Sequence, residues 1–249
     1  AGVAVSLHLE ENGLAAKRIG RRGLSAADWR GAAKSCDRVL RLIQAGRSEG
    51  RHAFLDLPAD RTLIDAAQSF ARARKGTYDA VTVLGIGGSA LGTTAVASAL
   101  RPAFPDAGRV SPRLTVLDNI DPEWLSDYLA GAELKRTLFC VVSKSGGTPE
   151  TAAQFLWMRD LLRRRFGAKH RAQVVIVTDP AKGPLREIAC AEGYPSFPIP
   201  PAVGGRFSVL SAACLAPLAL VGVDVKGLCR GAAAMERACR APFSKNPAA

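Results

Sequence analysis

The sequence predicts an α/β protein with a parallel sheet that carries helices on both faces. Four short apolar runs, mostly β-branched and each too short for a helix, recur at regular intervals. Segments of helical composition lie between them, and this alternation favours parallel strands. The chain has 249 residues and 48% hydrophobic content, which is enough to bury a full core. The expected strands are residues 80–84, 114–117, 138–142 and 174–177.

Two helices are expected before the first strand. Over residues 25–44 apolar side chains recur at helical spacing, and Ser25 and Asp28 are placed like a capping box. A second helix is expected to begin after Asp60, its N-cap, and to end near residue 74. These elements predict a helical N-terminal segment that packs on the sheet domain.

The rest of the chain completes the alternation. Residues 196–199 are bordered by prolines, so they form either an edge strand or an extended approach to a loop. The expected helices are 89–100, 122–129 with Asp121 as N-cap, 148–166, 208–221 and 225–240. The expected units are an N-terminal segment, a sheet domain and C-terminal helices, at residues 1–76, 77–205 and 206–249.

The net charge of +12 fits nucleic acid, an anionic small substrate or only a basic solvated surface. The densest basic run, residues 159–165, falls late in an expected helix, where cations complement the helix dipole. No aromatic residues for base stacking are interleaved with it, which disfavours nucleic acid. The uncharged stretch 207–223 is shorter than the ~20 apolar residues of a membrane span, and Pro217 interrupts it.

Cysteine and histidine usage indicates a reduced, cytoplasmic protein without a metal site. The six cysteines show no CxxC spacing, and several lie in apolar runs. Residues 1–10 do not place a basic cluster before an apolar run, so no signal peptide is expected. His8, His52 and His170 lie far apart, with no partner at metal-ligand spacing.

A first glycine-rich loop, residues 85–89, follows an expected strand and opens an expected helix. Its glycines allow a tight turn whose N–H groups can face an anion, and Ser89 can cap the helix and donate its hydroxyl. A turn without a ligand fits the same residues. The loop also satisfies GxGxxG/A, but Asp118 comes later than the ~20 residues expected for a ribose-binding acid, so a dinucleotide site matches weakly.

A second loop, residues 143–151, also lies between an expected strand and a helix. The hydroxyls of Ser143, Ser145 and Thr148 surround the Lys144 ammonium, a set that suits a phosphate dianion. A simple helix cap, with Thr148 as N-cap, fits too and is compatible with a phosphate over the same helix end.

A third segment, Val203-Gly204-Gly205-Arg206-Phe207-Ser208, places an arginine between a two-glycine turn and an apolar stretch. A guanidinium at this position can contact substrate oxygens and stabilise developing negative charge. The alternative is a surface arginine, which the positive end of a helix dipole disfavours.

Together these three segments resemble the glucose-6-phosphate isomerase family. The resemblance implies a flavodoxin-like sugar-isomerase (SIS) domain. Arg206 would face the sugar near C1 and C2, and Glu150 would support the active-site histidine from behind. The implied ligands of the substrate phosphate are Gly88, Ser89, Ser143, Lys144, Ser145 and Thr148.

The family reaction interconverts glucose 6-phosphate and fructose 6-phosphate through a cis-enediolate, without a cofactor, in glycolysis and gluconeogenesis. In the family the glutamate base, and the histidine and lysine that complete the site, come from later in the chain. The resemblance, over residues 80–249, therefore implies an N-terminal part that leads toward an absent second SIS domain and forms a homodimer when full length. Two other functions stay open: a non-catalytic SIS module that binds sugar phosphate, and an NAD-dependent oxidoreductase.

Overall fold

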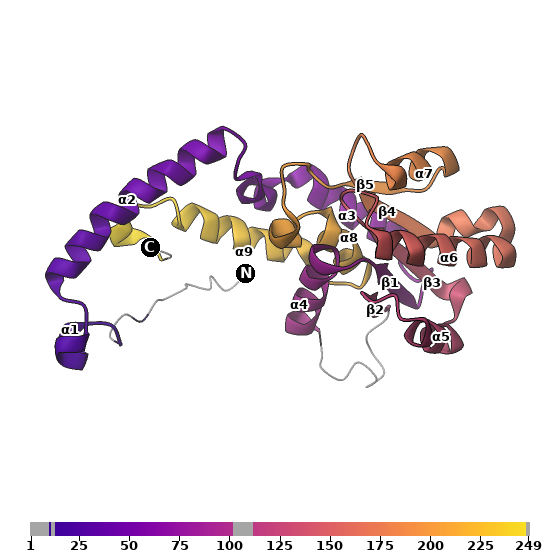
Figure 1. Ribbon diagram of the computed structural model, residues 1–249, viewed down its shortest axis with the longest axis horizontal. Helices are drawn as coiled ribbons and strands as arrows, with labels where there is room; N and C mark the ends of the chain where they lie inside the picture. The colour runs from indigo at the N-terminus through magenta and orange to yellow at the C-terminus, as the bar shows by residue number, and fades with distance from the viewer. Residues whose placement is uncertain (1–9, 11–12, 102–111, 248–249) are drawn as a thin grey trace.

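The computed structural model describes residue 10 and residues 13–101 and 112–247. Its centre is a five-stranded sheet of order β2-β1-β3-β4-β5 in which all pairs are parallel (Figure 1). This is the flavodoxin-like order, as the resemblance implied. The strands are β1 (Ala80–Leu84), β2 (Arg113–Leu117), β3 (Thr137–Val142), β4 (Val174–Thr178) and β5 (Ser196–Pro198).

Helices cover both faces of the sheet, which confirms the predicted three-layer α-β-α arrangement. Side chains alternate between the faces along β3, so that Cys140 joins one buried cluster and Phe139 the other. Both faces of β3 are therefore buried, as expected for a central parallel strand. The first cluster lies under α3 (Arg61–Ala73), α4 (Leu91–Leu100) and α8 (Ala212–Leu220), and the second under α5 (Pro122–Gly131), α6 (Pro149–Phe166) and α7 (Pro184–Glu192).

The fifth apolar run is the edge strand that the sequence left as one of two possibilities. β5 pairs with β4 alone, and the Ile199 N–H donates to the Thr178 carbonyl oxygen at 2.8 Å. An edge strand needs ladder bonds on one side only, so Pro198 is tolerated there.

Two helix predictions need correction, and one helix was not predicted. The helix expected at 89–100 begins at Leu91, after a 3-10 turn η3 (Gly87–Ser89), so Ser89 does not cap it. The helix expected at 208–221 is a 3-10 segment η6 (Gly205–Leu210) followed by α8, whose N-cap is Ser211. Helix α7 was not predicted, because Gly183 stands at its N-cap position with φ +100° and no side chain caps it.

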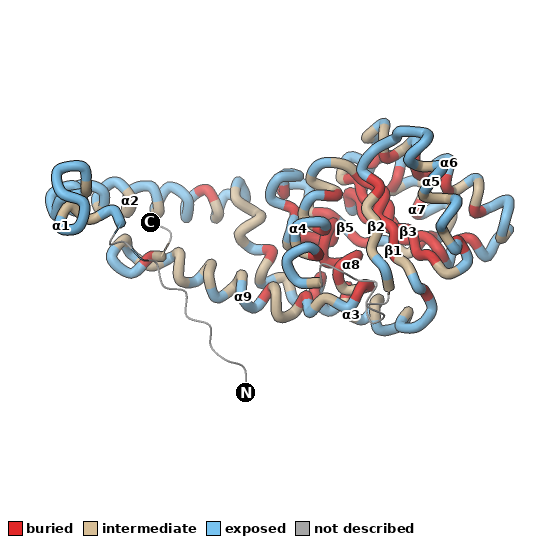
Figure 2. The backbone as a smooth tube through the Cα atoms, turned by 90° about the horizontal axis from the view of Figure 1, so that it is seen from below, coloured by how far each residue is buried: buried red, intermediate tan, exposed pale blue. Residues whose placement is uncertain are grey.

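Helix α2 (Ala26–Ser48) and helix α9 (Val225–Ala238) lie side by side and project from the sheet domain as an arm (Figures 1 and 2). The predicted capping box is present, since the Asp28 N–H donates to Ser25 Oγ at 3.2 Å and the Ser25 N–H donates to Asp28 at 2.8 Å. Of the N-terminal helices, α3 packs on α8 in the core, whereas α2 lies along α9. The residue boundaries of the three units stay a prediction.

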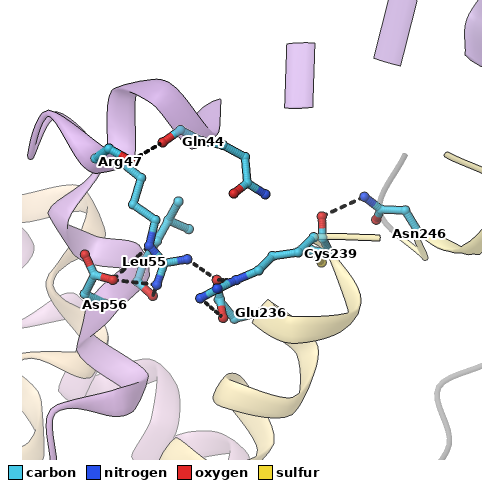
Figure 3. Close-up of polar contacts among 9 residues, drawn as sticks. Gln44, Arg47, Leu55, Asp56, Glu236, Cys239 and Asn246 are labelled. Carbon is cyan, nitrogen blue, oxygen red and sulfur yellow. Dashed lines mark hydrogen bonds and ion pairs between the residues drawn. The ribbon is translucent and has the colours of Figure 1, made fainter. Parts of the chain in front are cut away.

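An ion-pair cluster joins the two helices of the arm near their C-terminal ends (Figure 3). Arg47 donates to Asp56 at 2.8 Å and also pairs with Glu236 of α9. Arg240 donates to the two Glu236 carboxylate oxygens at 2.6 and 2.9 Å. These bonds, the one from Arg240 first, hold the pKa of Glu236 below its usual value.

We expect Glu236→Gln to lower the free energy of unfolding by about 1–3 kcal/mol at neutral pH, because it removes charge-assisted hydrogen bonds. The folded-state pKa is lowered, so the stability is fully present above the ordinary glutamate pKa and is lost as the pH falls through the folded-state value. Urea denaturation from pH 7 to pH 3 measures this, and the difference between the two proteins should shrink in acid.

Glu49→Gln is the control for this prediction. Glu49 pairs with Arg51 on the surface, where both side chains are more than half exposed, so its loss should change stability little. A pH-independent difference between Glu236→Gln and the parent would contradict the assigned role of the carboxylate.

Three observations concern partners and cofactors. None of the helices in the described part of the chain is both long and apolar enough to cross a membrane. Within residues 10, 13–101 and 112–247 no three His, Cys, Asp or Glu side chains gather where they could hold a metal ion. All six cysteines are free thiols, and His8 lies outside the described residues.

Candidate functional site

The two predicted loops meet at the point where the strand order reverses. From β1 the chain crosses to β2 on one side and then to β3 on the other, and ligands of open α/β sheets bind at the carboxyl ends of such a pair. The loop after β1 begins beside the end of β3, where the second loop starts, since a Cβ on Gly85 would lie 2.8 Å from the Val142 carbonyl oxygen. The topology therefore brings both candidate loops to the same edge of the sheet.

Three hydroxyls converge in the loop after β3. Ser143, only 2% exposed, has its Oγ 3.0 Å from Thr148 Oγ1, and Ser145 Oγ lies 3.4 Å from the same atom. The Gly146 N–H donates to Ser143 Oγ at 3.2 Å, and the Gly147 N–H donates to Ser145 Oγ at 3.3 Å. The loop is thus folded so that its hydroxyls face one another.

The start of helix α6 carries no side-chain cap. Thr148 occupies the N-cap position, but its hydroxyl faces the two serines and does not accept from the helix N–H groups; Pro149 follows at the first helical position. Thr148 and Pro149 therefore take the N-cap and first helical positions that the simple-cap alternative assigns to them, but the Thr148 hydroxyl accepts no helix N–H group. N–H groups at an uncapped, positive helix end are ready to bind an anion.

The ammonium of Lys144 does not join the hydroxyls. It donates to the carbonyl oxygens of Pro201 at 2.8 Å and Val203 at 3.0 Å. Because a lysine has three N–H donors, one remains for a ligand. Lys144 therefore ties the loop after β3 to the segment that leads into Arg206.

The loop after β1 packs directly on the third segment. A Cβ on Gly88 would lie 2.3 Å from the Gly205 carbonyl oxygen, so glycine alone permits this approach. Ser208 Oγ lies 2.7 Å from the carbonyl oxygens of both Gly88 and Gly205. Ser89, half-buried at the end of η3, follows Gly88 directly.

Arg206 is exposed in η6, and Glu150 is half-buried in the first turn of α6. Neither side chain makes a hydrogen bond or ion pair with any part of the chain that the structure describes. Phe207 stacks on Phe54 at 4.5 Å between ring centroids, which anchors the turn beside Arg206. The backbone of η6 therefore fixes the position of Arg206, while the N–H groups of its guanidinium have no partner among the described residues.

A further loop, after β4, borders the same edge of the sheet. The Asp179 N–H donates to the Lys144 carbonyl oxygen at 3.2 Å. The N–H groups of Ala181 and Lys182 donate to its carboxylate at 2.9 and 3.0 Å, and these bonds, the one from Ala181 first, lower the pKa of Asp179. This ionised side chain stabilises the loop and is not directed at the hydroxyl cluster.

The three segments singled out in the sequence lie together in the structure, but the sequence analysis did not name some of the residues that join them. The contacts of Ser208 and Gly205 with Gly88, and of Asp179 with Lys144, link segments far apart in the chain. The sequence signal for the contacts of Gly205 and Ser208 was that both residues lie within two positions of Arg206 in the third segment.

Comparison with known proteins decides the family. A family model described as phosphoglucose isomerase matches residues 62–248, three quarters of the chain. The chain belongs to the phosphoglucose isomerase family. The resemblance inferred from the three segments is thereby confirmed, and both candidate loops and Arg206 lie within the matched residues.

Relatives in the phosphoglucose isomerase family are similar along most of the chain. The glucose-6-phosphate isomerase of Carboxydothermus hydrogenoformans is 34% identical over 98% of this chain and 54% of its own length. That of Rubrobacter xylanophilus is 44% identical over 72% of this chain and 43% of its own length. The chain therefore spans about half the length of the curated relatives that it matches.

Two solved structures superpose on this chain over part of their own length. A hypothetical protein from Thermus thermophilus superposes with a TM-score of 0.79 and 33% identity, over 89% of this chain and 53% of that one. A glucose-6-phosphate isomerase from Chlamydia trachomatis superposes with a TM-score of 0.64 and 25% identity, over 75% and 35% of the two chains.

Proposed function

We propose that this chain supplies the phosphate-binding side and the arginine of a glucose-6-phosphate isomerase site. The observation that carries the proposal is the convergence of the Ser143, Ser145 and Thr148 hydroxyls at the uncapped start of α6, beside the Arg206 turn. The relatives bear the name of this isomerase. Neither a non-catalytic module nor an NAD-dependent oxidoreductase is favoured by the comparisons.

Each residue type suits a part of this reaction. The phosphate is remote from the reacting carbons, so its binding energy can orient C1 and C2. As the proton moves between these carbons, negative charge develops on the enediolate, and Arg206 can offset it because a guanidinium stays protonated. Glu150, in the first turn of α6, keeps the supporting role that the family resemblance implies. The reaction belongs to glycolysis and gluconeogenesis, and the proposed location is the cytoplasm.

The proposal is tested by calorimetric titration of the chain with 6-phosphogluconate, with inorganic phosphate as a competitor. We expect saturable binding that phosphate displaces, and no binding of NADH followed by fluorescence. Absence of 6-phosphogluconate binding, or tight NADH binding, would sink the proposal.

Catalytic turnover by this chain alone is tested separately from ligand binding. The chain covers about half the length of its relatives, and the family resemblance assigns the base to the part that these residues do not match. We therefore propose that this chain alone shows little or no isomerase activity in a coupled assay. Rates typical of an isomerase, kcat about 1–10³ s⁻¹, would show that the matched half is sufficient.

Thr148→Ala is expected to weaken the binding of inorganic phosphate by about 1–3 kcal/mol, because it removes a hydroxyl that can donate to a charged ligand. Ser143→Ala should act similarly, since the two hydroxyls lie 3.0 Å apart. Thr62→Ala, in the first turn of α3 and outside both candidate loops, is the control and should leave phosphate affinity unchanged. Equal losses in all three variants would point to a general effect on folding.

A further inference from the structure

We propose that Ser208 is a positioning residue that holds the Arg206 turn against the phosphate loops, so that one ligand can engage both. This inference rests on the proposed function, because it assigns a role within the same site. It adds a residue that touches no substrate and acts through the backbone of its neighbours.

The Ser208 hydroxyl bridges two segments that are distant in sequence. It lies 2.7 Å from the Gly88 carbonyl oxygen in η3 and 2.7 Å from the Gly205 carbonyl oxygen in η6. A hydroxyl has one proton, so its donation is shared between the two acceptors. Ser208 is 5% exposed, so water does not readily replace it as the donor to Gly88.

An ordinary capping role does not account for this hydroxyl. The following helix, α8, is capped by Ser211, whose Oγ accepts the Ala213 N–H at 3.2 Å and donates to the Ser208 carbonyl oxygen at 2.7 Å. The Ser208 hydroxyl is directed to Gly88, on the loop that ends in Ser89. The contact of Ser208 with Gly88 therefore joins η6 to the loop after β1.

The Arg206 turn is fixed on both sides. Before it, Lys144 donates to the carbonyl oxygens of Pro201 and Val203, which joins the turn to the loop after β3. After it, Ser208 joins the turn to the loop after β1. Arg206 lies between these two attachments with an exposed, unengaged guanidinium. Its position relative to both phosphate loops thus depends on contacts made by its neighbours.

This arrangement predicts a coupling that can be measured with two ligands. Inorganic phosphate engages the loops alone, whereas 6-phosphogluconate also carries a carboxylate at the C1 end, which Arg206 can contact. The preference, defined as the ratio of the two dissociation constants, therefore reports how well Arg206 is placed relative to the loops. A loss of folded protein alone changes both dissociation constants by the same factor and leaves the preference unchanged.

The experiment is calorimetric titration of the whole chain and its variants with both ligands. We expect the parent to prefer 6-phosphogluconate by about tenfold or more, as one charge-assisted contact allows. Ser208→Ala should reduce this preference to about threefold or less while phosphate still binds. Arg206→Ala should remove the preference, and adding Ser208→Ala to it should change nothing further.

Ser211→Ala is the matched control, because it removes a buried serine hydroxyl three residues away that does not contact Gly88. It should lower stability and retain the preference. If Ser208→Ala does not fold, Ser208→Cys preserves the size with a much weaker donor, and the same loss of preference is expected.

An unchanged preference in a folded Ser208 variant overturns the inference and leaves the proposed function standing. Failure of the parent chain to bind either ligand overturns the proposed function and this inference with it. A parent that binds both ligands equally overturns the inference alone, because Arg206 then makes no contact for Ser208 to position.

Discussion

Phe139→Ala is expected to lower the free energy of unfolding by about 3–5 kcal/mol, because it leaves a large cavity in the core. Phe139 is fully buried on the central strand β3, where it packs with Phe155 and Met158 of α6. The other face of β3 supports a separate cluster, so collapse around the cavity is resisted from both sides. Urea denaturation followed by circular dichroism measures the change.

The control is the same substitution at a half-exposed phenylalanine. Phe207 is 52% exposed and stacks on Phe54, so Phe207→Ala should cost about 0.5–1.5 kcal/mol for the lost aromatic pair. Comparable losses in the two variants would contradict the assignment of β3 to the centre of the core.

Gly88→Ala is expected to impair stability and ligand binding together. The new Cβ would lie 2.3 Å from the Gly205 carbonyl oxygen and 2.6 Å from its Cα. Backbone atoms cannot swing aside as a flexible side chain can, so the loop after β1 must move away from the Arg206 turn. We expect a loss of about 1–3 kcal/mol in the free energy of unfolding, with weaker binding of inorganic phosphate and 6-phosphogluconate.

Gly31→Ala is the control for the glycine substitution. Gly31 lies within α2, where a Cβ would meet nothing within 4 Å, so alanine should stabilise the helix by about 0.5–1 kcal/mol. Ligand affinity should not change, because α2 lies in the arm and not in the candidate loops. Normal phosphate binding by Gly88→Ala would show that the two loops need not approach closely.

Much of the fold could be predicted because local patterns determine it. The runs that became β1, β3 and β4 consist of residues suited to strands that are buried on both faces. Asp60 and Asp121 were expected as N-caps, and their carboxylates accept the N–H groups of Leu63 and Trp124. Helix α7 lacked such a signal, since Gly183 precedes it.

The types of residue in the candidate site could be predicted from the sequence, but the contacts between their side chains could not. Glycines and hydroxyls after β1 and β3 indicated an anion site, because parallel strands bring their carboxyl ends to one edge. The direction of the Lys144 ammonium was not predictable: a flexible side chain takes its partners from whatever lies in reach, here the carbonyl oxygens of Pro201 and Val203. The arm is a similar case, since its Arg47–Glu236 pair joins residues far apart in the chain.

The sequence by itself determined the parallel α/β fold, the two loops and the family, because each depends on short stretches of neighbouring residues. The tertiary structure alone decided how Arg206 is held against the loops. That arrangement depends on the approach of Gly88 to Gly205 and on the Ser208 hydroxyl between them. The bond from Ser208 to Gly88 joins residues 120 positions apart in the chain, and no local pattern encodes such a contact.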